Sequence, residues 1–199
     1  MQQVFTNIYE RCVWGNNGAR LYNGSSGGGS DVEFNLNTYI PFLKKFIIDN
    51  KIETICDLGC GDFRCGPLIY NDIECKYIGY DTYSKVIEAN KITNLDSKFN
   101  FIHLDFFSQK EEIVAGDLCI LKDVIQHWQL EKIYLFLDYL VSSKKFKYIL
   151  ICNCSNQTQD NTTISDGECR PLHSNFFPLK KYSPVEVYRY DIKQVCLIR

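Results

Sequence analysis

The sequence lacks long apolar runs and a strong excess of charge of either sign. Its longest apolar runs, such as "YIGY" and "YILIC", are strand-sized and far shorter than the roughly 20 residues that a membrane-spanning helix needs. The 199 residues carry a formal net charge of -2, and the scattered lysine pairs are typical of a solvated surface rather than of a basic stripe. We therefore expect neither a membrane nor a nucleic-acid partner.

Metal-ligand spacings are also missing, although the chain contains ten cysteines. Cys56, Cys119, Cys152 and Cys196 lie inside apolar runs, where a free cysteine behaves as a small hydrophobic residue. No pair of cysteine pairs has zinc spacing, and no carboxylate and histidine cluster has ligand spacing, so no metal site is expected. Residues 1–15 carry charge without an apolar core, which argues against a secretory signal. These absences predict a cytoplasmic protein, in the host cytoplasm if the source is viral.

What the chain does contain is an alternation of strand-like and helix-like segments from residue 53 onward. The expected strands, each a short apolar run, are 53–59, 75–81, 99–105, 117–123 and 147–153. The expected helices are 63–71, 83–92 and 129–143. Residues 185–190 and 192–198 then predict a terminal β-hairpin. The expected fold is α/β: a single-domain, Rossmann-like α/β/α sandwich with a doubly wound sheet of five parallel strands and this C-terminal hairpin.

The first 50 residues have a different character. The stretch "NGSSGGGS" at 23–30 has low complexity, but several aromatic residues precede it and argue against a disordered tail. Ser30-x-x-Glu33 matches a capping box, which predicts a helix that runs toward Asp49 with an interruption near Pro41. A loop that ends on a helix N-terminus can be a linker or can contact a ligand, and the residues alone leave both open.

The glycine turn "DLGCGDF" follows the first expected strand, at the edge of the sheet where ligands of such folds bind. A phosphate-binding loop would need a lysine after Gly66, and none is there. A dinucleotide turn would have a third glycine where Arg64 stands, and the carboxylates of Asp57 and Asp62 would repel a diphosphate. The acidic flanks favour S-adenosylmethionine (SAM), which has no phosphate and carries an ammonium and a sulfonium.

Three aspartates at successive strand ends support this interpretation. Asp57 is placed to accept from the amino-acid ammonium of SAM, Asp81 from the ribose hydroxyls and Asp105 from the adenine amino group. Gly59 and Gly61 allow the backbone to pass close to the ligand because they have no Cβ. A strand-end aspartate is a common cap, but three of them beside one glycine turn predict a cofactor site.

With these residues in place, the chain resembles class I SAM-dependent methyltransferases, and most of all a small, largely uncharacterised bacterial- or viral-type group. The matching pieces, in order along nearly the whole chain, include "WG", "SGGGS", "DLGCGDF", "YIGYD", "FIHLD", "DLCILKDVIQHW" and "DGECRPLHSNFFPL". The resemblance implies one methyltransferase domain over 1–199, with an N-terminal cap segment 1–50, a SAM-covering loop 22–30 and a catalytic core 51–199. The cofactor contacts that it implies are Trp14, Ser26, Gly27, Gly29, Ser30, Asp57, Gly59, Cys60, Gly61, Asp81, Asp105, Phe106 and Lys122.

The segment "KDVIQHW" faces the methyl group in this architecture and holds the candidate catalytic residues. If Asp123 begins a helical turn, His127 lies four residues on along the same face, where Asp123 can orient it or bind the acceptor. His127 has a pKa range suited to a general base, and a purely structural role is the alternative.

The polar loop before the hairpin supplies the candidate acceptor contacts, Arg170 and His173. The alternative for Arg170 is a surface ion pair with Asp166 or Glu168. The family pattern has an acidic residue where this chain has His173, and this departure weakens any transfer of substrate identity.

The predicted function is methyl transfer to a small polar acceptor, with O-methylation of a sugar or nucleotide-linked sugar preferred. The chain has no appended domain and no basic stripe for holding a nucleic acid. N-methylation of a small amine is the main alternative, because that reaction needs no base. A SAM-binding subunit without catalysis of its own is the third possibility.

Overall fold

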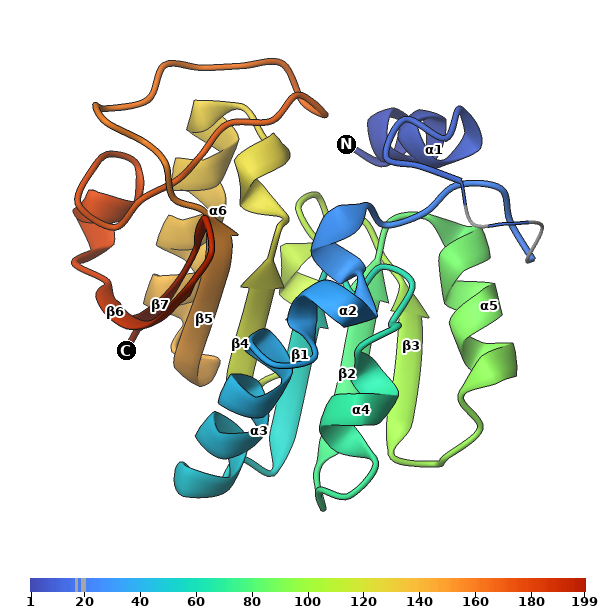
Figure 1. The fold of residues 1–199 in the computed structure, drawn as a ribbon. Helices are drawn as coiled ribbons and strands as arrows, with labels where there is room; N and C mark the ends of the chain where they lie inside the picture. The colour runs from blue at the N-terminus through green and yellow to red at the C-terminus, as the bar shows by residue number, and fades with distance from the viewer. Residues whose placement is uncertain (17, 19–20) are drawn as a thin grey trace.

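The computed structural model describes residues 1–16, 18 and 21–199, and it places them around one seven-stranded sheet (Figure 1). The parallel strands are β1 (Thr54–Leu58), β2 (Lys76–Asp81), β3 (Phe99–His103), β4 (Gly116–Lys122) and β5 (Phe146–Cys154). The strand order is β3-β2-β1-β4-β5-β7-β6, in which the antiparallel hairpin of β6 (Val185–Tyr190) and β7 (Lys193–Ile198) continues the sheet beyond β5. The predicted sheet of five parallel strands and a C-terminal hairpin is confirmed.

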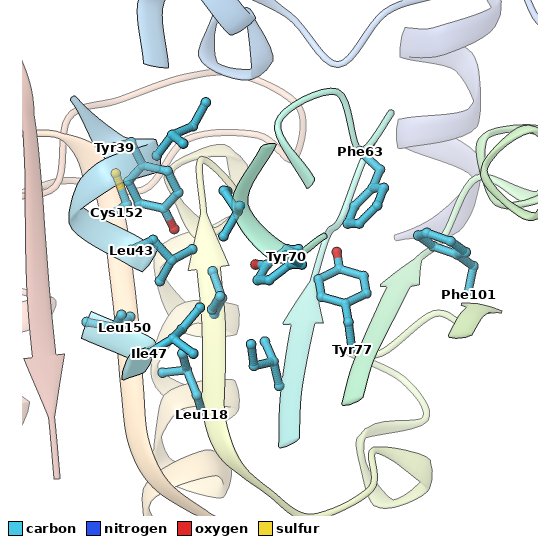
Figure 2. Packing of buried hydrophobic residues seen from close by; sticks show 14 of the residues in the cluster. Tyr39, Leu43, Ile47, Phe63, Tyr70, Tyr77, Phe101, Leu118, Leu150 and Cys152 are labelled. Carbon is cyan, nitrogen blue, oxygen red and sulfur yellow. The ribbon is translucent and has the colours of Figure 1, made fainter. Parts of the chain in front are cut away.

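Helices cover both faces of this sheet. Figure 1 shows α3 (Tyr39–Asp49) and α4 (Gly66–Tyr70) in front of the sheet and α6 (Leu130–Ser143) behind it. Helix α5 (Ser84–Thr93) packs in the same core cluster as α3 and α4, whereas α6 packs in the other one. Successive side chains of β4 point to opposite faces of the sheet. Leu118 (Figure 2) and Ile120 pack in the core on the α3 side, and Cys119 and Leu121 pack in the core on the α6 side. Because both faces of the central strands are buried, those strands consist of continuous apolar runs.

The helix expected at 63–71 is shorter in the structure. α4 begins at Gly66, because Phe63 has a left-handed backbone (φ 52°) that an α-helix does not contain. The ring of Phe63 packs against Tyr77 and Phe101, at centroid distances of 4.7 and 5.0 Å. The expectation that Phe63 begins the helix was therefore wrong.

The helix start expected at Ser30 is also corrected. Asp31 is the N-cap of α2 (Val32–Asn35), and its carboxylate accepts a backbone N–H of the first turn. The hydroxyl of Ser30 donates instead to the carbonyl of Gly27, inside the short 3-10 turn Gly28–Ser30. The chain leaves the helix after α2 and re-enters it as α3 just before Pro41, so the predicted interruption is confirmed.

An additional helix, α1 (Gln2–Glu10), lies over the carboxyl ends of the parallel strands (Figure 1). The sequence did not predict it as a helix. The ring of Tyr9 stacks on Tyr83 with centroids 4.5 Å apart, and the carboxylate of Glu10 accepts from the Tyr83 hydroxyl and the Lys85 ammonium. These contacts attach α1 to the start of α5.

In the described part of the chain, no helix combines the length and the apolar character that crossing a membrane requires.

Leu137 and Leu135 of α6 allow a matched test of this packing. The side chain of Leu137 is 0% exposed and that of Leu135 is 55% exposed. Leu137→Ala leaves a cavity and should lower the free energy of unfolding by about 2–5 kcal/mol. Leu135→Ala should change it by less than about 0.5 kcal/mol. Urea unfolding of both variants measures the difference, and equal effects would contradict the placement of α6.

Candidate active site

A pocket opens at the carboxyl ends of the parallel strands, under α1 and the loop that follows it. The pocket and its open mouth together span about 1100 Å³, part of which is open to solvent, and a small-molecule ligand fits a space of this size. The predicted site residues in its lining are Trp14, Ser26, Gly29, Ser30, Asp57, Gly59, Cys60, Gly61, Asp81, Asp105, Phe106, Lys122, Asp123 and His127. Three predicted residues, Gly27, Arg170 and His173, are not part of this lining.

The glycine turn is clamped between neighbouring segments. Gly59 and Gly61 have left-handed backbones, with φ of 86° and 54°. A Cβ on Gly59 would lie 2.5 Å from Cγ2 of Val124, and one on Gly61 would lie 2.5 Å from the hydroxyl oxygen of Ser26. The N–H of Gly59 donates to the carbonyl of Tyr80 at 2.8 Å, which ties the turn to β2. Glycine is therefore required at both positions.

Two carboxylates lie beside this turn, that of Asp81 buried and that of Asp57 half-buried. Asp57 accepts from the hydroxyl of Tyr77 at 2.7 Å, and Asp81 accepts from the N–H groups of Gly61 and Tyr83, each at 3.0 Å. Burial raises the pKa of Asp57 and the pKa of Asp81 to about 6 each, despite these hydrogen bonds. At neutral pH both groups are thus ionised at an energetic cost, which a cationic or hydroxyl-bearing ligand would offset.

At the end of β3, Asp105 and Phe106 form another part of the lining. The carboxylate of Asp105 accepts from the N–H of Ser108 at 3.4 Å. The ring of Phe106 lies 5.9 Å from those of Trp128 and Phe136, measured between centroids. This part of the pocket therefore combines an aromatic wall with one acceptor group.

The glycine-rich loop 22–30 is a wall of the pocket and not a linker. The hydroxyl of Ser26 bonds the Tyr9 hydroxyl and accepts from the N–H of Asp62, both at 2.8 Å. The ammonium of Lys122, at the end of β4, donates to the carbonyl of Gly29. Gly27 shapes the loop from outside the lining, with a left-handed backbone (φ 81°), so its expected cofactor contact is not seen.

Asp123 does not orient His127, contrary to the sequence-based hypothesis. Its backbone is left-handed (φ 59°), so no helical turn begins there. Its carboxylate pairs with the ammonium groups of Lys122, at 2.9 Å, and of Lys193 from β7. Burial opposes the ionised carboxylate, but the two ammonium groups outweigh it and lower the pKa of Asp123. Asp123 therefore anchors the hairpin and the end of β4 to each other.

His127 lines the pocket in a defined tautomer. Its Nδ1 lies 3.0 Å from the carbonyl of Glu168, which can only accept, so Nδ1 carries the proton. Its Nε2 lies 3.3 Å from the amide nitrogen of Gln126, whose amide oxygen accepts from the N–H of Cys154. Burial lowers the pKa of His127, which keeps the ring neutral at pH 7. The lone pair of Nε2 therefore faces the amide of Gln126.

Arg170 has neither of its two expected roles. Its side chain is 5% exposed, and its guanidinium donates to the carbonyls of Trp128, at 2.6 Å, and Thr162, at 3.0 Å. Asp166, one expected partner, pairs with Lys132 instead. Arg170 thus holds the polar loop against the segment that carries His127.

His173 also lies apart from the pocket lining, so the structure does not support its predicted acceptor contact. Its Nδ1 accepts from the N–H of Asn175 at 3.0 Å, and its Nε2 lies 3.2 Å from the guanidinium of Arg189. These contacts join the polar loop to β6.

Sequence reasoning missed the lining residues that α1, α3 and α4 contribute, among them Phe5, Tyr9, Tyr39 and Tyr70. The aromatic residues before the glycine-rich loop were a signal for the first two, because a disordered tail has few of them. Within the described ranges, no group of three or more His, Cys, Asp or Glu side chains is placed to hold a metal ion.

No protein-family model and no curated protein matches this sequence. Solved structures match it in three dimensions. The methyltransferase domain of bacterial CtHen1-C has a TM-score of 0.62 at 14% identity, over 82% of this chain and 97% of that one. An O-methyltransferase family protein from Burkholderia thailandensis has a TM-score of 0.59 at 12% identity, over 80% of this chain and 54% of that one. The fold is that of class I methyltransferases.

Human N-acetylserotonin methyltransferase, solved in complex with SAM, shares this fold with a TM-score of 0.56 at 17% identity. The alignment covers 81% of this chain and 54% of the human chain. This chain therefore spans about half the length of the human and Burkholderia methyltransferases, and nearly all of the CtHen1-C domain.

The hydrogen bond between Tyr77 and Asp57 allows a test of the site's electrostatics within this methyltransferase fold. The Tyr77 hydroxyl stabilises the ionised carboxylate, so Tyr77→Phe should raise the pKa of Asp57 above about 6. The pKa of Asp81 should stay at about 6, because its bonds come from backbone N–H groups. Carboxyl 13C NMR titration measures both values. A pKa of Asp57 that falls or stays constant would contradict the geometry.

Proposed function

We propose that the protein is a SAM-dependent methyltransferase that acts on a small polar acceptor. The observation that carries the proposal is the row of three carboxylates, Asp57, Asp81 and Asp105, that line one pocket beside a glycine turn. A diphosphate cofactor would bring negative charge against all three. SAM brings an ammonium and a sulfonium, and it supplies an activated methyl group.

The lining residues fit SAM group by group. Asp57 would accept from the amino-acid ammonium, and Asp81 would accept from the ribose hydroxyls. Asp105 can accept from the adenine amino group beside the ring of Phe106. A side chain at Gly59 would collide with Val124, so the turn keeps its shape beside the pocket only with glycine there.

The chain's own contribution to the reaction is alignment and exclusion of water. Phe5 and Tyr9 from α1, with Trp14 after it, cover the pocket from above. For a hydroxyl acceptor, Nε2 of His127 would exchange the amide of Gln126 for the acceptor O–H and take its proton. The carbonyl of Glu168 would stabilise the resulting imidazolium through Nδ1–H.

We further propose a sugar or a nucleotide-linked sugar as the acceptor. Its hydroxyl groups suit a neutral histidine base, and the ring of Trp14, 5.0 Å from that of His127, offers a flat apolar surface for a sugar ring. Ten cysteines without a disulfide are in keeping with a reducing cytoplasm as the place of action.

N-methylation of a small amine is a second candidate. The observation in its favour is that the lone pair of His127 Nε2 already faces the Gln126 amide, so a reaction without a base needs no rearrangement there.

Cofactor binding is testable with S-adenosylhomocysteine and isothermal titration calorimetry. The wild type should bind it, and Asp81→Asn should weaken binding about tenfold or more, because hydrogen bonds to a charged group are lost. Asp49→Asn, which removes an exposed carboxylate paired with Lys45 on α3, should bind like the wild type. Absence of binding to the wild type would overturn the proposed function.

Replacement of His127 separates the two acceptor chemistries. His127→Asn should lower the rate of O-methylation by about 10²–10⁴-fold and leave the affinity for S-adenosylhomocysteine within a few-fold of the wild type. The matched control is His103→Asn, since His103 bonds the carbonyl of Thr82 and does not line the pocket. Methyl transfer from labelled SAM measures both rates. A rate retained by His127→Asn would favour the amine acceptor over the sugar.

A further inference from the structure

Residues 166–170 of the polar loop run alongside the segment that carries His127, and we call them the clasp. The N–H of Gly167 donates to the carbonyl of His127 at 2.8 Å. One residue further on, the carbonyl of Glu168 lies 3.0 Å from Nδ1 of the same histidine. The clasp therefore contacts both the backbone and the ring of His127.

Arg170 anchors one end of the clasp from inside the protein. It is 5% exposed, and its guanidinium donates to the carbonyls of Trp128 and Thr162. Its backbone N–H donates to the carbonyl of Gln126 at 3.1 Å. Gln126 and Trp128 flank His127 in the sequence, so Arg170 is bonded to the chain on both sides of this histidine. A buried carbonyl that loses its donor costs free energy, so the guanidinium fixes the position of the clasp.

Asp166 anchors the other end of the clasp. Its carboxylate accepts from the N–H of Gln129 at 3.1 Å and pairs with the ammonium of Lys132 on α6. The clasp is also closed by a turn, in which the carboxylate of Glu168 accepts from the N–H of Ser165 at 2.7 Å. Because the clasp is held at both ends and closed by this turn, the carbonyl of Glu168 keeps one direction.

Gly167 also faces α1, and only glycine fits there. Its backbone is left-handed (φ 93°), and a Cβ would lie 2.8 Å from Cδ1 of Ile8 and 3.0 Å from Cγ1 of Val4. Val4 and Ile8 are about one helical turn apart, and the residues that follow them, Phe5 and Tyr9, line the pocket. The clasp is therefore in contact with the helix that covers the pocket as well as with the candidate base.

We propose that the clasp aligns the base and the cover of the pocket as one unit, with Arg170 and Gly167 as its positioning residues. The proposal rests on the proposed function, because it takes His127 as the base. Which ring nitrogen of a neutral histidine carries the proton is set by the hydrogen bonds of the ring. With Nδ1–H held by the Glu168 carbonyl, Nε2 keeps the lone pair that takes the proton of an acceptor hydroxyl. Neither positioning residue lines the pocket, so each acts through His127 or α1.

The tautomer of His127 is the first readout, and 15N NMR of the imidazole nitrogens resolves it because the chain has three histidines. The wild type should carry the proton on Nδ1. Arg170→Met removes every donor of the guanidinium, so a second form with the proton on Nε2 should appear. The matched control is Arg189→Met, which removes an exposed guanidinium that pairs with Glu186 and lies near His173. The control should change the signals of His173 and leave those of His127.

Amide hydrogen exchange of α1 is the second readout. Exchange in this helix should be about tenfold faster or more in Arg170→Met, because the displaced clasp no longer supports α1. Gly167→Ala should have the same effect, since its Cβ would push Ile8 away. Exchange in Arg189→Met should equal that of the wild type.

Thermal unfolding identifies the variants that fold. If Arg170→Met does not fold, Asp166→Ala carries the same two predictions, because it removes the other anchor of the clasp. A folded variant with the wild-type tautomer of His127, or with the wild-type exchange of α1, overturns the proposal. A wild-type His127 with its proton on Nε2 overturns it as well.

Calorimetry with S-adenosylhomocysteine on the same samples separates this proposal from the proposed function. A wild type that does not bind this ligand overturns the proposed function, whereas the tautomer and exchange readouts still decide whether the clasp aligns His127 and α1. A wild type that binds it, together with an Arg170→Met variant that is unchanged in both readouts, overturns the clasp alone.

Discussion

Burial of negative charge at the glycine turn is the constraint on which the site depends. Asp57 and Asp81 end neighbouring parallel strands, so the sheet itself brings them to one edge, and the chain then covers them. Burial raises the pKa of each to about 6, compared with 3.8 for an exposed carboxyl. Because the folded-state pKa is raised, each group favours folding below pH 4, and this contribution is lost as the pH rises through 6. A fold that retains such a cost at neutral pH gains from a ligand that supplies positive charge or hydroxyl donors.

The cover over these carboxylates is held by residues far apart in the sequence. Lys122 donates to the glycine-rich loop through the Gly29 carbonyl and pairs with Asp123, and Asp123 pairs in turn with Lys193 of the terminal hairpin. A Cβ on Gly29 would lie 2.4 Å from the carboxylate of Asp123, so the loop and this ionic cluster fit only because of the glycine. One partly buried cluster therefore links the N-terminal loop, the central strand β4 and the C-terminal hairpin.

The sheet and the strand-end aspartates that line the pocket could be predicted from sequence because both follow from local patterns. Strands buried on two faces leave continuous apolar runs, and strand-end aspartates such as Asp81 meet at one edge in any parallel sheet. The rest depends on contacts that sequence spacing does not encode. Asp123 lies 70 positions from its partner Lys193, and its left-handed backbone removes the helical turn that would have placed it beside His127. The charge of Arg170 suggested an anion site, but its guanidinium donates to backbone carbonyls of Thr162 and Trp128. These contacts depend on the fold of the polar loop and could not be predicted from sequence spacing.

The central claim is that the carboxylates around the glycine turn hold SAM. A crystal structure of the protein with S-adenosylhomocysteine at pH 7 tests it most directly. The predicted result places the ribose hydroxyls on the carboxylate of Asp81, the adenine amino group at Asp105 and the amino-acid ammonium at Asp57. A ligand bound elsewhere, or one in this pocket with its ribose away from Asp81, would contradict the claim.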